Sequence, residues 1–177
     1  MDTPDDSSLQ PANSLYLSAA GKNLLEAAES AALQPYDDQT GEPTSVWVRG
    51  ATIGYGHLIT QNEWSTYQNG FTQDDADALL DHDLAQTVAT VRNSISAEVS
   101  QNQFDAMVIL CFNIGPGNFT TSSVHTLVNN PNAKTAYDSL QDAWMAWTQS
   151  QGHQMAGLVK RRQCEWAVYS QGVYNPW

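Results

Sequence analysis

Two acidic residues near the start of the sequence stand in contrasting surroundings. Glu29 lies in AAESAAL, where nearly all neighbours are small and apolar, and such surroundings disfavour an ionised carboxylate. Asp38 follows nine residues later in PYDDQTG, where polar neighbours favour ionisation. Hydrolysis of a glycosidic bond requires an acid for the leaving oxygen and a second carboxylate across the sugar. The contrast therefore indicates this acid–base chemistry, although nineteen acidic residues offer many such pairs.

Three motifs in a fixed order narrow this interpretation. TIGYGH occupies residues 52–57, FNIGPGNFTTSS occupies residues 112–123, and AWTQSQGHQMAGLVKRRQCEWAVY occupies residues 146–169. Together with the stretch from Leu17 to Thr60, which holds the first motif and both acidic residues, they are spread over most of residues 15–170 and resemble the phage-type lysozymes of glycoside hydrolase family 24. The resemblance implies a muramidase. Such an enzyme hydrolyses the β-1,4 bond between N-acetylmuramic acid and N-acetylglucosamine in peptidoglycan and lyses the bacterial cell wall.

The family pattern also implies roles for individual residues. Glu29 is expected to be the proton donor. Asp38 is expected to hold or activate the attacking water, or to stabilise the cationic transition state, and Thr52 to help place that water. No cofactor and no metal are implied. Four residues match positions that line the substrate-binding cleft in the family: Leu58, Phe112, Asn113 and Ser122. The alternative for each of them is ordinary packing in the core or in a loop.

Two departures from the family pattern affect the site. Ser30 stands where the family usually has glycine directly after the catalytic glutamate. The spacing from Asp38 to Thr52 is also longer than the family spacing by about eight residues. The extra stretch, near residues 42–51, is expected to lengthen a hairpin and to add cleft wall or shift Asp38. It leaves Asp37 as a competitor for the role of the second carboxylate, with Asp38 favoured because it matches the family's Tyr-x-Asp arrangement.

Other reactive side chains have structural interpretations. The resemblance implies that His57 pairs with Asp83 rather than acting in catalysis, and the remaining histidines fit no metal pattern. Cys111 and Cys164 lie in apolar helical patterns and are expected to be buried thiols, with a disulfide left open. The basic cluster at residues 160–162 is expected to be a solvated helix face with an ion pair.

The elements that must position these residues follow from capping and periodicity. Ser18 can cap a helix that runs to about Leu33 and stops at Pro35. Glycines divide residues 36–60 into short β-prone runs at 45–49 and 51–55, which predict a hairpin or a three-stranded sheet. Later helices are expected from Thr72, from a Ser100/Gln103 capping box to Phe112, from Asn130-Pro131 through Leu140, Trp144 and Trp147, and over residues 156–170.

This order predicts an α+β fold of the lysozyme-like type, with a small β-hairpin lobe and a mostly helical lobe flanking a substrate cleft. Residues 1–14 are expected to be a disordered leader, and residues 15–177 a single catalytic domain. Within that domain, the β-rich lobe is expected at about 36–60 and the helical lobe at about 72–172. The N-terminal segment lacks the basic start and apolar run of a secretory signal, and no run of residues is long and apolar enough to span a membrane.

A net charge of −12 argues against nucleic acid or an anionic membrane as a partner. The expected partner is the peptidoglycan glycan strand, and the chain is expected to be a monomer. It is expected to act in the periplasm or cell wall of a target bacterium, either as a phage endolysin released through a holin or as an effector delivered by a secretion system. The effector case would imply an immunity protein. Alternatives are a lytic transglycosylase and a catalytically inactive, lysozyme-like domain that binds wall or protein.

Overall fold

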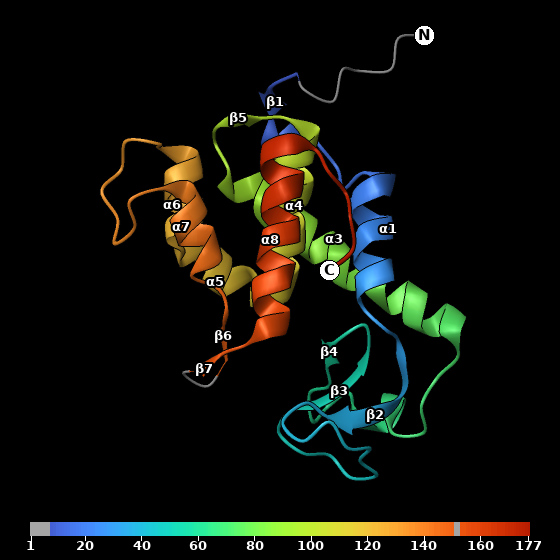
Figure 1. Ribbon diagram of the computed structural model, residues 1–177. Coiled ribbons are helices and arrows are strands. Elements are labelled where there is room, and N and C mark those ends of the chain that lie inside the picture. Colours follow the sequence, from blue (N-terminus) through green and yellow to red (C-terminus); the bar gives the residue numbers. More distant parts are fainter. Residues whose placement is uncertain (1–7, 151–152) are drawn as a thin grey trace, which may run out of the picture. The chain divides into compact units, whose positions relative to one another are not determined.

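The computed structural model describes residues 8–150 and 153–177 (Figure 1). The chain forms two compact units. One comprises Glu26–Ala85, and the other comprises the residues before Glu26 together with Gln86–Trp177. The mixture of helices with small antiparallel sheets confirms the α+β class. Among the described residues, no helix combines the length and apolarity needed to cross a membrane.

The unit Glu26–Ala85 contains an antiparallel sheet with the order β2-β3-β4 (Figure 1). Tyr36 lies opposite Thr52 between β2 and β3, and Thr52 lies opposite Leu58 between β3 and β4. Ala51, Ile53 and Ile59 form the buried core of this unit. The elements of the unit are β2 (Ala32–Asp37), β3 (Ala51–Gly54), β4 (His57–Leu58), α2 (Trp64–Tyr67) and the first part of α3 (Gln73–Ser94).

The first helix is shorter than its sequence predicts. The hydroxyl of Ser18 accepts a hydrogen bond from the Gly21 amide at 3.0 Å, which confirms the predicted cap. However, α1 (Ala19–Ala28) ends before Glu29, and Pro35 lies inside β2 rather than stopping a helix. Pairing of the following residues with β3, beginning at Ala32 opposite Gly54, outweighs the helical preference of the alanines.

The helical unit is built around α4. Residues from Phe104 to Cys111 in this helix are all buried, and α4 packs chiefly against α8. Trp144 and Val168 complete the same core. The elements of this unit are β1 (Gln10–Pro11), the 3-10 helix Ala12–Ser14, most of α1, the part of α3 from Gln86 onward, β5 (Glu98–Val99), α4 (Gln101–Ile114), α5 (Pro116–Thr121), α6 (Ser123–Asn129), α7 (Leu140–Met145), β6 (Gln149–Ser150), β7 (His153–Gln154) and α8 (Ala156–Gln171).

Helix starts with matching side-chain caps agree with the sequence. Ser100 and Gln103 form the expected capping box at the start of α4. At the start of α3, the Thr72 hydroxyl accepts from the Asp75 amide at 3.2 Å while Asp75 accepts from Thr72. Reciprocal bonds of this kind satisfy amides that a helix end leaves unpaired, which explains why the spacing predicts these boundaries.

Three other predictions differ from the structure. Residues 8–14 are ordered, because Gln10 pairs with Val99 and Ala12 is buried, while residues 1–7 of the predicted leader lie outside the described residues. No helix begins at Asn130-Pro131; α7 starts instead at Leu140, where the Ser139 hydroxyl accepts from the Asp142 amide. Residues 45–49 form no strand, although the predicted three-stranded sheet is present.

Candidate active site

Glu29 occupies the junction between a helix and a strand. It is the first residue after α1, three positions before β2 begins, and its side chain is half-buried. The next residue, Ser30, is exposed. This junction fixes the backbone on either side of the carboxyl group. Glu29 is therefore tied to the same sheet that carries the other predicted catalytic residues.

Asp38 and Thr52 share one hydrogen-bond acceptor. Asp38 follows the last residue of β2, and its amide donates to the carbonyl oxygen of Gly50 at 3.0 Å. The hydroxyl of Thr52 donates to the same oxygen at 2.9 Å. Thr52 is buried at 4% exposure, whereas Asp38 is exposed. The structure thus brings these two predicted residues together through one intervening carbonyl group.

Tyr36 connects the carboxylates to the sheet. Burial raises the pKa of its phenol above the ordinary value, and the negative charges of Asp38 and Glu29 raise that pKa further. Both carboxylates therefore lie within electrostatic reach of one phenol oxygen. Because cross-strand partners share a face, Tyr36 and Thr52 belong to the same face of the sheet, and Asp38 follows in the turn directly after β2.

Asp37 has a different environment from Asp38. Its carboxylate accepts the Gln39 amide at 3.0 Å, and its carbonyl accepts the amides of Thr40 and Gly41. These bonds fold the turn that follows β2. Oδ1 of Asp37 and Oδ1 of Asp38 nevertheless lie 3.3 Å and 2.2 Å from one point, the position that a Cβ on Gly50 would occupy. The hydrogen bonds therefore give Asp37 a part in the turn, and the choice between Asp37 and Asp38 as the second carboxylate stays a prediction.

The extra stretch between β2 and β3 packs onto the sheet. Pro43 forms an isolated bridge with Tyr36 along the outer edge of β2. The indole of Trp47 donates to the carbonyl of Ile59 at 2.9 Å, and Trp47 and Val48 pack on the core of this unit. The extra stretch therefore packs against the sheet and the core of this unit, and it ends at Gly50.

Leu58 lies beside the same group of residues. It is 58% exposed, and its register opposite Thr52 puts both side chains on one face of the sheet. Leu58 thus presents an exposed apolar side chain beside the buried Thr52 hydroxyl, and its role as a contact residue stays a prediction. The face therefore carries Tyr36, Thr52 and Leu58 in a row across three strands.

His57 is paired as the sequence predicts. Its Nδ1 lies 2.9 Å from a carboxylate oxygen of Asp83, and both side chains are partly exposed. Its Nε2 lies 3.7 Å from an oxygen of Glu63, and Tyr67 contacts the ring edge-on. The hydrogen bond to Asp83 is the largest cause that raises the pKa of His57, and it outweighs the opposing effect of burial. His57 therefore joins β4 to α3.

The remaining predicted contact residues lie in the helical unit. Phe112, near the end of α4, is half-buried. Asn113 is exposed, and its side-chain oxygen accepts from the guanidinium of Arg162. Ser122 is buried, and its hydroxyl caps α6 by accepting from the His125 amide at 3.0 Å. The Ser122 hydroxyl thus has a structural function whatever else it contacts.

The basic cluster on α8 is only partly solvated, which corrects the sequence prediction: Lys160 is exposed as expected, but the two arginines are buried. Arg161 and Arg162 are 5% and 0% exposed, and both bind the fully buried carboxylate of Glu165. The indole of Trp144 donates to Glu165 at 3.0 Å. Burial lowers the pKa of Arg162, and the adjacent Glu165 opposes this effect. The predicted ion pair is present, but it lies in the core because tertiary packing covers this helix face.

Both cysteines are free thiols, Cys111 buried and Cys164 half-buried, and burial raises the pKa of Cys111 to about 12. Over residues 8–150 and 153–177, no group of three or more His, Cys, Asp or Glu side chains is arranged to hold a metal ion.

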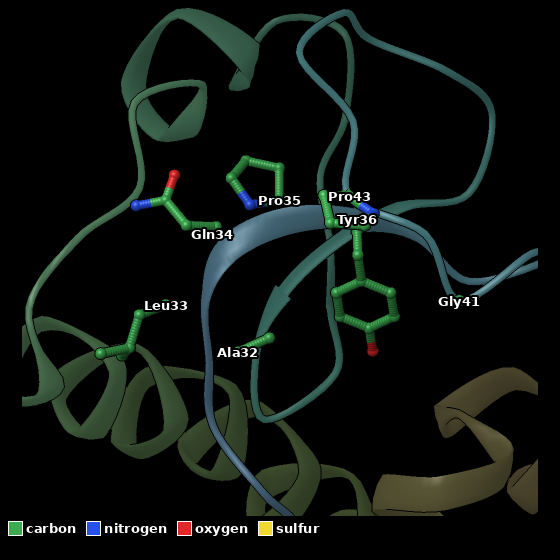
Figure 2. A pocket seen from close by; sticks show the side chains of 7 residues that line it. All are labelled: Ala32, Leu33, Gln34, Pro35, Tyr36, Gly41 and Pro43. Atoms are coloured by element: carbon green, nitrogen blue, oxygen red, sulfur yellow. The ribbon is translucent and has the colours of Figure 1, made fainter.

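A shallow apolar cavity of about 440 Å³ borders β2. Figure 2 shows the Tyr36 ring extending from the strand on the side opposite to Gln34 and Pro35, with Pro43 beside the strand. Tyr36 both lines this apolar cavity and has a pKa that responds to the charges of Asp38 and Glu29. Sequence reasoning used Tyr36 only as part of a spacing pattern and did not single out Gly50. The cavity is lined by Ala32, Leu33, Gln34, Pro35, Tyr36, Gly41 and Pro43.

The chain is similar to several known proteins. The family model described as phage lysozyme matches residues 26–165. An endolysin of Acyrthosiphon pisum secondary endosymbiont phage 1 is 33% identical over 159 residues, which cover 88% of this chain and 98% of that protein. The solved endolysin from Escherichia coli O157:H7 phage FAHEc1 aligns with a TM-score of 0.69 and 26% identity, covering 91% of this chain and 97% of that one. The muramidase domain of SpmX from Asticaccaulis excentricus aligns with a TM-score of 0.68 and 32% identity, covering 88% and 98%.

Proposed function

Since the chain belongs to the phage lysozyme family, we propose that Glu29, Asp38 and Thr52 form its catalytic site. The chain is a muramidase, a glycoside hydrolase that cleaves peptidoglycan at the β-1,4 bond between N-acetylmuramic acid and N-acetylglucosamine. The alternative, that the chain is a catalytically inactive domain that binds wall or protein, is not favoured, because relatives of the chain are endolysins.

The shared carbonyl of Gly50 is the observation that carries this assignment. It holds the Asp38 backbone and the Thr52 hydroxyl on one oxygen, at 3.0 and 2.9 Å. The pKa of the adjacent Tyr36 responds to both Asp38 and Glu29. These contacts support grouping two carboxylates and one hydroxyl in one site, and glycoside hydrolysis requires such a pair of carboxylates.

The hydrogen bonding of Thr52 defines how it would orient water. Its hydroxyl donates a hydrogen bond to the Gly50 carbonyl, so the oxygen retains lone pairs that can accept a hydrogen bond from water. Asp38 would accept the other proton of that water and act as the general base. Glu29, protonated, would donate to the leaving glycosidic oxygen. Asp38 thus gains the proton that the water loses, and Glu29 loses the proton that the leaving oxygen gains. The two transfers balance.

Glycan binding would use residues beyond the catalytic three. Leu58 offers an exposed apolar surface beside Thr52, and Phe112, Asn113 and Ser122 are assigned to the glycan by their match to the family pattern. The Asn113 amide nitrogen is the group best suited to a sugar hydroxyl or acetamido oxygen, because its side-chain oxygen already accepts from Arg162. Substitution of any of these contact residues should raise KM more than it lowers kcat.

A matched pair of substitutions tests the choice of the second carboxylate. Asp38→Asn should lower kcat on purified peptidoglycan by about 100-fold or more, the usual effect of losing a general base. Asp37→Asn should keep kcat within a few fold, because its carboxylate organises the turn. Release of reducing ends measures activity, and thermal unfolding shows whether both variants remain folded. Loss of kcat in Asp37→Asn with retention in Asp38→Asn would reverse the assignment.

The proposal also covers where the protein acts and which partners it has. The protein would act as a monomer in the periplasm or cell wall of the target bacterium, after holin-mediated release or delivery by a secretion system. The acidic charge supports delivery, because a long-range field of this sign hinders approach to an anionic wall from outside. Delivery into another bacterium would require an immunity protein in the producing cell. Light scattering of the purified chain tests the monomer, since a mass near 19.4 kDa is expected.

A further inference from the structure

We infer that Gly50 is a positioning residue for the catalytic pair, because its missing side chain leaves the space in which the Asp38 carboxylate sits. The inference rests on the proposed function, which assigns Asp38 as the base and Thr52 as the residue that orients water. Gly50 itself has no side chain to touch a substrate. Its effect on the reaction would therefore pass through Asp38 and Thr52.

The space around Gly50 is already filled by carboxylate. A Cβ atom built on Gly50 would lie 2.2 Å from Oδ1 of Asp38 and 3.3 Å from Oδ1 of Asp37. Ordinary contacts of a Cβ begin near 3.4 Å, so Asp38 would have to retreat by about 1 Å or more. Gly50 also has a φ of +112°, a conformation that side-chain-bearing residues rarely adopt.

The backbone of Gly50 adds a second constraint. Its carbonyl accepts from the Asp38 amide and from the Thr52 hydroxyl, so the orientation of one peptide group determines both. A residue that required a different φ would rotate this peptide group. It would thereby move the Asp38 backbone and the hydrogen of Thr52 together. Gly50 thus controls the carboxylate by contact and the hydroxyl by hydrogen bonding.

This constraint explains how the longer connection remains compatible with the site. Gly50 lies at the end of the extra stretch, which Trp47 and Pro43 anchor to the sheet. The chain therefore returns to β3 in a fixed position before Thr52. A glycine at this return point lets the added residues approach Asp38 without displacing its carboxylate.

The collision with Asp38 should appear in catalysis rather than in folding, whereas the positive φ of Gly50 should lower the thermal stability of a substituted chain. The colliding atom is the end of an exposed aspartate side chain, which can move with little loss of stability. Gly70 provides the contrast, because a Cβ there would lie 2.5 Å from the backbone oxygen of Leu33. Gly41 offers a control in the same connection, since it has a φ of +75° and open space around its Cβ position.

The test compares Gly50→Ala with Gly41→Ala. Gly50→Ala should lower kcat on purified peptidoglycan by about 100-fold, the order expected when a catalytic group moves by about 1 Å, with KM changed less than threefold or so. Gly41→Ala should retain kcat within about twofold while losing a similar amount of thermal stability from its positive φ. Retention of kcat by Gly50→Ala, or an equal loss in both variants, would overturn the inference.

A double-substitution cycle shows whether Gly50 acts through Asp38. In an Asp38→Ala background the colliding carboxylate is absent, so adding Gly50→Ala should lower the residual kcat by less than about threefold. A further loss of about 100-fold in that background would contradict the inference. If Asp38→Ala alone retains kcat, the assignment of Asp38 fails instead, so the two failures are distinguishable.

Gly50→Asn supplies a second variant in case the alanine variant does not fold. Asparagine accepts positive φ more readily than alanine but carries the same Cβ atom. The loss of kcat should therefore persist with a smaller loss of thermal stability. Titration of the Tyr36 phenol by NMR gives a signature independent of turnover, because its pKa depends on Asp38. A Tyr36 pKa unchanged from that of the parent chain in a folded Gly50→Asn variant would contradict displacement of the carboxylate.

Discussion

Thr52 illustrates how a buried hydroxyl can serve both fold and chemistry. Its proton is committed to the Gly50 carbonyl, and its side chain lies between those of Tyr36 and Leu58 on neighbouring strands. Because the hydroxyl already donates its one hydrogen bond to Gly50, the Thr52 oxygen can only accept a hydrogen bond from water. A methyl group in place of the hydroxyl would keep the packing and would remove that role together with the hydrogen bond to Gly50.

Thr52→Val should therefore lower kcat by about 10- to 100-fold while changing the free energy of unfolding by about 1 kcal/mol, the usual net contribution of one hydrogen bond. Thr52→Ser retains the hydroxyl and should recover most of the activity. Urea denaturation and turnover of peptidoglycan measure the two effects. A valine variant as active as the parent chain would remove Thr52 from the proposed mechanism.

Sequence motifs predict the residues of the site better than they predict its geometry. Glu29, Asp38 and Thr52 stand out because motif order and chemistry agree. Gly50 is one of eleven glycines, and its role depends on a φ and a contact that a single sequence does not display. Tyr36 is similar, since its relation to both carboxylates arises only when β2 pairs with β3.

The pairing of β4 with α3 depends on titratable groups. His57 binds Asp83 at 2.9 Å and lies near Glu63, and its pKa is raised above 6.5. A raised pKa contributes stability that is fully present below pH 6.5 and is lost as the pH rises through the folded value. The pKa of Glu63 is lowered from 4.5, chiefly by its hydrogen bonds from Thr60, so its contribution is lost as the pH falls below 4.5.

Between about pH 4.5 and 6.5 both contributions are present, so Asp83→Asn should cost the most stability there and progressively less as the pH rises above 6.5. Asp138→Asn, an exposed aspartate in the helical unit, is the control and should show no such trend. Thermal unfolding across pH 4 to 9 measures both. A stability loss for Asp83→Asn that is independent of pH would contradict the ionic pairing.

The packing of α8 against the rest of the helical unit depends on one buried carboxylate, that of Glu165. Glu165 accepts from Arg161, Arg162 and Trp144, and Arg162 also donates to the Trp147 carbonyl at 2.9 Å. Removing the charge of Glu165 would leave a fully buried guanidinium without its counter-ion. Such a loss costs much more than a surface substitution.

Glu165→Gln should lower the free energy of unfolding by about 3 kcal/mol or more, whereas Glu98→Gln at an exposed position should change it by less than about 0.5 kcal/mol. Urea denaturation monitored by tryptophan fluorescence suits the measurement, because Trp144 contacts Glu165. Equal small changes in the two variants would show that the buried cluster contributes little.

At the level of elements, predictions succeeded where the deciding interactions are local. The capping box of α4 lies within four residues of sequence, so its spacing alone identifies it. The end of α1 is decided by pairing of Ala32 with Gly54, and the burial of Arg162 by packing against Trp147 and Asn113. These partners are distant in sequence, and therefore a local pattern cannot reveal them.

Charge is distributed unequally over the whole molecule. Residues 26–85 contain eleven acidic side chains and one basic side chain, Arg49, so this unit carries −10 of the net −12. The unit with this charge also holds Glu29, Asp38 and Thr52. An anionic substrate surface would therefore be repelled over the distances at which electrostatic fields act.

Hydrolysis of wall that retains its anionic polymers should accelerate as salt is added, because the Debye length falls from about 30 Å at 0.01 M to about 10 Å at 0.1 M. Wall stripped of those polymers is the control and should show a much weaker dependence. Initial rates at fixed pH measure the effect as kcat/KM. A rate that falls with salt on both substrates would contradict repulsion as the limiting factor.

Proton donation by Glu29 is the central claim for the whole enzyme, and it is tested by digestion of purified peptidoglycan. The parent chain should release muropeptides with new N-acetylmuramic acid reducing ends. Glu29→Gln should lower this rate by about 100-fold or more while still sedimenting with the wall. Glu26→Gln, one turn earlier in the chain, should remain active. A parent chain that binds wall without cleaving it, or a Glu29→Gln variant as active as the parent, would contradict the claim.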